Sequence, residues 1–181
     1  MIAALVHASA VTSVISNDEL LRTTWVDGGV VTRHQFNVNE SMRDWVEKRF
    51  HFRPKEQVVT VWLSRDSLSS QILAGMIKQD VRYQQQPISL VIGLSHGLRV
   101  SRAAIVALLE TLRQEFESSI GVGYLKRYTM MSVRQLRYLA NVLQKEGQPS
   151  ALVGEQLFKS GAILAAVIKT TGLKARGLAS E

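Results

Sequence analysis

The fold is constrained above all by two short and almost wholly apolar runs, Gln57–Leu63 and Ile88–Ile92. Runs of this length and composition are typical of strands that are covered on both faces. Each run is followed by a segment whose apolar residues recur at helical spacing, over residues 67–77 and 101–117. Strand–helix–strand repeats predict parallel pairing with right-handed crossovers. The chain is therefore expected to form a sheet with helices packed on it.

The residues before these runs predict further strands. Val11–Ile15, Leu20–Val26 and Val30–Phe36 are rich in β-branched residues and are separated by turn clusters, which indicates an antiparallel meander. Asn39 can cap a helix over Glu40–Phe50. The predicted fold class is α/β: an N-terminal antiparallel meander, then strand, helix, strand and helix in a mixed sheet, and a helical C-terminal portion. This element order resembles that of ribonuclease-H-like and actin-like domains.

The residues after Gly123 are expected to be helical. Ser132 and Ser150 can cap two of these helices, and Gly161 is expected to interrupt the last part. The expected helices cover residues 133–144, 151–159 and 163–168. We divide the chain into an α/β domain over residues 1–120 and a basic helical extension over residues 121–181, packed on the same domain.

Composition narrows the class of protein. A chain of 181 residues with 46% hydrophobic residues can bury a sizeable core. No stretch has the roughly 18 uninterrupted apolar residues of a membrane span, so none is expected. The chain has no cysteine, which excludes disulfides, thiol nucleophiles and thiolate zinc sites. The absence of cysteine fits a reducing cytosol, and we expect a cytoplasmic protein.

Basic charge is concentrated in the second half of the chain. Residues 88–181 carry 12 basic against 6 acidic residues, whereas residues 1–87 carry 10 against 9. Residues 118–145 contain no acidic residue at all. Such a block attracts polyanions, namely nucleic acid, anionic lipid or an acidic protein, and the alternative is a solvated helix face.

Aromatic residues are interspersed with these cations. Arg134, Arg137 and Tyr138 fall at helical neighbour spacing and can share a face. Cations next to aromatic rings suit phosphate contact combined with base stacking. The predicted binding residues are Lys126, Arg127, Arg134, Arg137 and Tyr138.

Residues 93–97 match G-x-S-x-G, the nucleophile elbow of serine hydrolases, with Ser95 as the nucleophile. The expected strand before the motif and helix after it supply the usual context. The base of that family would follow the serine at a distance, but His96 is the last histidine of the chain and directly adjoins Ser95. A glycine-rich turn is the competing interpretation.

The same region fits a helix-turn-helix. Residues 100–105 resemble the start of a recognition helix, with Ser101 as its cap and Arg102 facing phosphate. The β-branched residues of Ile88–Ile92 favour a strand over the first helix of that motif. A second candidate begins with residues 134–139 and continues through residues 150–157 and 162–168.

The sequence favours a non-enzymatic binding protein that contacts nucleic acid or an acidic partner through its basic helical surface. The alternatives are a structural or adaptor subunit of a larger assembly and a serine hydrolase at Ser95. A ribonuclease-H-like nuclease would need carboxylates that hold two metals, and only Asp66 and Glu110 are placed to contribute. No phosphate-binding loop, dinucleotide fingerprint or metal-ligand spacing occurs, so no cofactor and no metal are expected. Whether the chain forms homo- or hetero-oligomers is left open.

Overall fold

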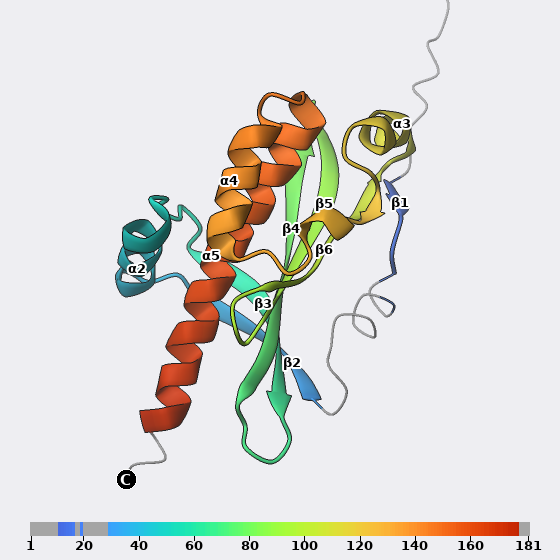
Figure 1. Cartoon of the computed structure of the whole chain (residues 1–181). Helices are drawn as coiled ribbons and strands as arrows, with labels where there is room; N and C mark the ends of the chain where they lie inside the picture. The colour runs from blue at the N-terminus through green and yellow to red at the C-terminus, as the bar shows by residue number, and fades with distance from the viewer. Residues whose placement is uncertain (1–10, 17–18, 20–28, 178–181) are drawn as a thin grey trace, which may run out of the picture.

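The computed structural model describes residues 11–16, 19 and 29–177. In this part the chain forms a seven-stranded sheet, and a long helix packs on its two central strands (Figure 1). The elements are β1 (Val11–Ser13), β2 (Gly29–Asn37), α2 (Glu40–Phe50), β3 (Val58–Asp66), β4 (Ile72–Tyr83), β5 (Gln86–Ser95), β6 (Val100–Leu109), α3 (Glu110–Ser119), β7 (Gly123–Tyr124), the 3-10 helix η1 (Lys126–Tyr128), α4 (Val133–Leu143) and α5 (Gln148–Gly177).

The sheet has the strand order β1-β6-β5-β4-β3-β2, and β7 also pairs with β6. Within the described residues all six ladders are antiparallel. The predicted combination of a sheet with helices, ending in a helical portion, is confirmed. The predicted parallel pairing is wrong, and with it the element order that resembled ribonuclease-H-like and actin-like domains. The expected meander is also altered, because β1 pairs with β6 and β2 with β3; Leu20–Val26 lies outside the described residues.

One of the predicted helices is a turn and a strand, and another is a helix only in its second part. Residues 67–77 contain a hairpin turn and the first half of β4, and residues 101–117 contain most of β6 followed by α3. The reason is that β4 and β6 are interior strands with apolar neighbours on both faces: Ile77 and Ile105 pack in the main core, and Met76 and Ala104 in a smaller cluster. Continuous apolar residues satisfy helical spacing by coincidence.

The helices that cover the sheet are built around α5. This helix contacts β4 and β5, and both α2 and α4 pack against it. Gly75 of β4 permits the close approach, because a Cβ there would lie 3.0 Å from the Leu164 side chain. The main core lies between the sheet and these helices.

The predicted starts of α2 and α4 are confirmed. Asn39 Oδ1 accepts a hydrogen bond of 3.0 Å from the Met42 N–H. Ser132 forms a capping box with Gln135 at the start of α4. The predicted break at Gly161 is wrong, since α5 runs without interruption, and Ser150 lies inside it and donates to the Ser119 carbonyl at 3.2 Å.

The first 24 residues of α5, Gln148–Thr171, are long and apolar enough to cross a membrane, and their most apolar 18-residue window has a mean hydropathy of 1.5. This is a statement of length and composition alone. In the structure 72% of the most apolar window of this segment is buried inside the protein, as in a core helix.

Candidate functional site

The five predicted binding residues lie on two neighbouring elements. Lys126 and Arg127 belong to η1, and the other three belong to α4. The Arg127 guanidinium lies 3.6 Å from a carboxylate oxygen of Glu146, just beyond α4. Arg137 donates instead to the carbonyl of Phe50, the last residue of α2, at 3.0 Å. The predicted residues therefore do not share one set of neighbours.

The α4 residues share a surface because one side of that helix is buried. Its buried side chains are Val133, Leu136, Ala140 and Leu143. Arg134 lies on the exposed side, and Tyr138, four residues on, is 73% exposed. Residues at this spacing are neighbours on a helix, so the guanidinium and the phenol ring lie on one face.

The neighbouring helix α2 adds a cation that the sequence analysis did not assign to a site. The Arg49 guanidinium lies 4.9 Å from the centre of the Trp45 ring. The i, i+4 spacing of these two residues was visible in the sequence, but nothing in the sequence linked α2 to α4. That link is the hydrogen bond from Arg137 to the Phe50 carbonyl. A cation at a helix C-terminus also interacts favourably with the helix dipole.

The acidic residues of α2 do not neutralise Arg49. Glu40, Asp44 and Glu47 recur at helical spacing on a different face, and all three pair with Arg53. At about 100° per residue, Trp45 and Arg49 are directed away from that face. Arg49 forms no ion pair within the described residues.

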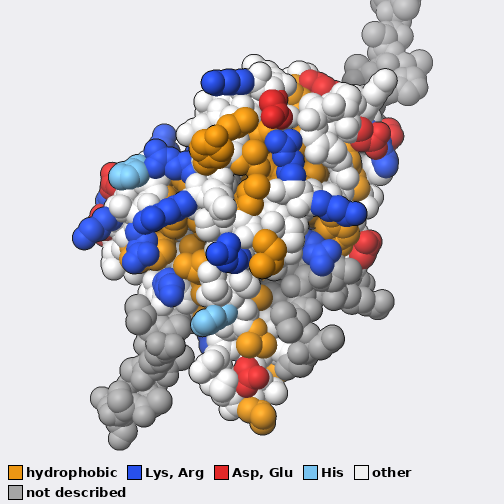
Figure 2. All heavy atoms as spheres, viewed as in Figure 1, with side chains coloured by type: hydrophobic (Ala, Val, Ile, Leu, Met, Phe, Trp, Pro, Cys, Tyr) orange, Lys and Arg blue, Asp and Glu red, His pale blue; other side chains and the backbone are white. Residues whose placement is uncertain are grey.

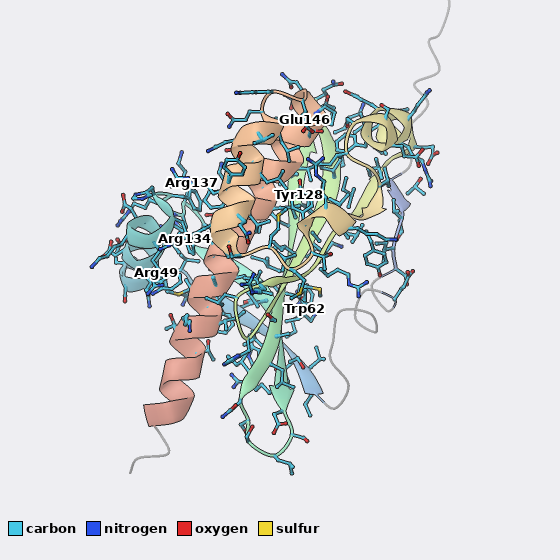
Figure 3. All side chains as sticks on the ribbon, in the orientation of Figure 1. Arg49, Trp62, Tyr128, Arg134, Arg137 and Glu146 are labelled. Carbon is cyan, nitrogen blue, oxygen red and sulfur yellow. The ribbon has the colours of Figure 1, made fainter. Side chains whose placement is uncertain are left out.

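We refer to Arg49, Arg134, Arg137 and Tyr138 as the α2–α4 basic surface. Figure 3 shows the three arginines on the side of the molecule where α2 faces α4. In the space-filling view, lysine and arginine side chains gather over the same side (Figure 2). Guanidinium groups bind phosphate and carboxylate oxygens in a two-pronged geometry, and an exposed tyrosine ring can stack.

The G-x-S-x-G motif does not form a nucleophile elbow. Ser95 ends β5, and a hairpin turn leads directly into β6, so a strand follows the motif where a helix was predicted. The Ser95 hydroxyl is engaged with the backbone of Arg99, at 3.3 Å from its carbonyl oxygen and 3.4 Å from its nitrogen. Within the described residues no histidine or carboxylate hydrogen-bonds to this hydroxyl.

Both helix-turn-helix interpretations are also wrong. Residues 88–108 form parts of two antiparallel strands, β5 and β6. The second candidate needs two helices over residues 150–168, where the structure has the continuous helix α5. Asp66 was one of the two carboxylates considered for a nuclease site. It accepts hydrogen bonds from the Leu68 and Ser69 N–H groups and so shapes the β3–β4 turn.

No protein-family model, curated protein or solved structure matches this chain. The chemistry of the α2–α4 basic surface is therefore the starting point for function.

Proposed function

We propose that this protein is a non-enzymatic binding protein whose α2–α4 basic surface contacts nucleic acid. The observation that supports this proposal is the bond from Arg137 to the Phe50 carbonyl, because it gathers guanidinium groups from two helices. Phosphate contacts from such groups supply most of the affinity of sequence-independent binding.

A single-stranded nucleic acid suits this surface better than a duplex. Tyr138 is 73% exposed and stands four residues from Arg134 on α4. A tyrosine ring stacks on a base only where that base is not already stacked within a duplex. In this proposal the arginines track the phosphates and Tyr138 receives a base. Lys126 and Arg127 of η1 supply further contacts to phosphates, and Arg127 also forms an ion pair with Glu146.

The test replaces Arg49 and Arg134 by glutamate, singly and together, and follows binding of fluorescent single-stranded DNA and RNA by anisotropy at several salt concentrations. Arg137 is left in place because its hydrogen bond to α2 would confuse loss of binding with loss of structure. Each phosphate contact to a single strand contributes about 0.7 to the slope of log K against log salt. The double variant should lower that slope by about 1.4.

The matched control is Arg82→Glu, which changes the net charge by as much as each single variant does. Arg82 is exposed on β4 and forms no ion pair or side-chain hydrogen bond with other described residues. Tyr138→Ala should weaken binding by about 1–3 kcal/mol while leaving the salt slope unchanged, because stacking is not an ionic contact. If Arg82→Glu loses as much nucleic-acid affinity as Arg49→Glu and Arg134→Glu each do, binding does not depend on a defined surface.

The same measurements separate nucleic acid from an acidic protein partner. If the wild-type protein binds neither DNA nor RNA but binds polyglutamate, and this binding is lost in the Arg49 and Arg134 variants, the partner is an acidic protein and not a nucleic acid. If the double variant keeps the wild-type affinity for single-stranded nucleic acid and the same salt slope, the proposal of a nucleic-acid-binding surface is wrong.

A further inference from the structure

The sheet divides into two arms between β3 and β4. The β3–β4 ladder ends at the pair Val61 and Ile77. Beyond that pair, β3 continues to pair with β2 as far as Val58, and β4 continues to pair with β5 as far as Tyr83. In Figure 1 the β2–β3 arm turns towards α2, while β4 and β5 continue beside α4 and α5. We call the space between the arms the fork.

Arg43 of α2 holds the β3 arm on its course. Its guanidinium donates to the carbonyls of Val38, Pro54 and Glu56, at 3.1, 3.1 and 2.9 Å. The last two carbonyls belong to the segment that enters β3. One arginine therefore ties this segment to α2 and not to β4.

The backbone of β4 presents unpaired groups to the fork. The His96 N–H donates to the Leu73 carbonyl at 2.8 Å, in the register that sets Ala74 opposite Ser95. Hydrogen-bonded pairs alternate along an antiparallel ladder, so odd-numbered residues of β4 bond to β5. Even-numbered residues direct their N–H and C=O groups to the other side.

In the fork these even-numbered residues are Asp80 and Arg82, because the last pair of the β3–β4 ladder already bonds the Lys78 N–H to the Thr60 carbonyl. Pro87, which has no N–H, lies opposite Arg82, as expected where no bond to β5 is made. Outside the ladders of the sheet, no hydrogen bond from another described segment reaches the backbone of Lys78–Tyr83. An open strand edge of this kind is a template for another strand.

A cavity of about 210 Å³ lies in the fork. Its lining includes Glu56, Val58, Thr60, Lys78, Asp80 and Ile163. Ile163 belongs to α5, so the cavity has an apolar contact with the core helix. The cavity is smaller than the pockets of about 300–1,000 Å³ that enclose drug-sized ligands, and suits a single side chain.

The lining carries one unsatisfied acidic group. Oε2 of Glu56 is buried and has no hydrogen-bond partner among the described residues. Asp80 accepts a hydrogen bond from the Ser89 hydroxyl. With Lys78, the lining has two acidic and one basic side chain, a net negative charge in a protein whose formal net charge is +7. A negatively charged lining favours a ligand that brings positive charge and hydrogen-bond donors.

We infer that the fork binds an extended peptide segment of another protein, which adds as a strand to the free edge of β4 and places a lysine or arginine side chain in the cavity beside Glu56. Backbone pairing with Asp80 and Arg82 supplies affinity, and the cavity supplies the preference for a basic residue. A second copy of this chain is a poorer occupant because two chains of charge +7 repel.

The test begins with selection of a random peptide display library on the full chain. Enriched peptides should share a lysine or arginine within a β-forming sequence. For one such peptide, Glu56→Gln should weaken binding at least about tenfold, because a charged hydrogen bond is lost. The same peptide with norleucine in place of its basic residue should bind wild type and Glu56→Gln equally. Glu117→Gln, on α3, is the control with the same change of charge.

The backbone part of the inference has separate tests. Arg82→Pro removes an N–H that faces the fork without removing a bond to β5, and should abolish peptide binding in a protein that circular dichroism shows to be folded. N-methylation of alternate peptide residues should block binding in one register and not in the other. Amide hydrogen exchange of Asp80 and Arg82 should slow when the peptide is bound.

Three outcomes would overturn the inference: a library that yields no enriched peptide, binding that Glu56→Gln and Arg82→Pro both leave intact, or exchange at the β4 edge that the bound peptide does not slow.

Discussion

At the scale of single residues, the hydroxyl of Tyr128 stands out because it is buried in the core without a hydrogen-bond partner among the described residues. A buried donor without a partner costs about 1–3 kcal/mol. Tyr128→Phe removes the hydroxyl and keeps the ring, so we expect the variant to be more stable by about that amount. Urea unfolding near pH 8 measures the difference.

The same residue should make stability depend on pH. Burial raises the pKa of Tyr128 to about 12. In the unfolded chain the hydroxyl ionises near its ordinary pKa of about 10, so between these two values the unfolded state binds fewer protons than the folded state. Stability should therefore fall above pH 10 by about 1.4 kcal/mol per pH unit. The difference between Tyr128→Phe and wild type should widen over this range, and a constant difference would contradict the assignment.

At the scale of elements, the contact between α4 and α5 depends on a glycine. A Cβ at Gly154 would lie 2.7 Å from Leu143 Cδ1 and 3.3 Å from Ala140 Cα. Gly154→Val should therefore separate the two helices and destabilise the protein by about 1–3 kcal/mol, as overpacking does. Chemical denaturation measures this loss, and Ala151→Val, at a half-buried position of the same helix, is the control. A smaller loss in Gly154→Val than in the control would show that the helices are not in close contact.

The elements that the sequence predicted correctly are those with a signal of their own. Asn39 and Ser132 predicted the starts of α2 and α4, and each accepts the N-cap hydrogen bond expected at its position. The strands β4 and β6 were mistaken for helices because their burial on both faces depends on neighbours distant in the chain.

The residues of the candidate site also fall into two groups, those predicted by local spacing and those brought together only by tertiary contacts. Arg134 and Tyr138 share a face of α4, as their spacing predicted. Arg49 was missed because only the tertiary contact between Arg137 and α2 brings it there. The fork could not be foreseen at all, since it exists only where the β3–β4 ladder ends.

At the scale of the whole molecule, α5 is the cover of the sheet. Its residues from Ala162 to Ile168 are all buried, and Leu164 and Ile168 approach Gly75 at the centre of the sheet. A chain that ends after Lys145 should leave this face of the sheet exposed, bind a hydrophobic dye and aggregate. Size-exclusion chromatography and dye fluorescence measure both effects.

A chain that ends after Thr171 is the control for this truncation. It retains Ile168, the last buried residue of the described part of α5, and should remain folded. A well-folded monomer from the shorter chain would show that the sheet does not need its cover.

The position of α5 in the chain also has a consequence for biosynthesis. The four strands from β3 to β6 pair with their neighbours in sequence, so they can assemble as they leave the ribosome. Roughly 60 residues separate the end of β6 from Ile168, a delay of about 3–12 s at ordinary rates of elongation. During that interval a nascent chain would hold an uncovered apolar sheet, the kind of surface that molecular chaperones bind.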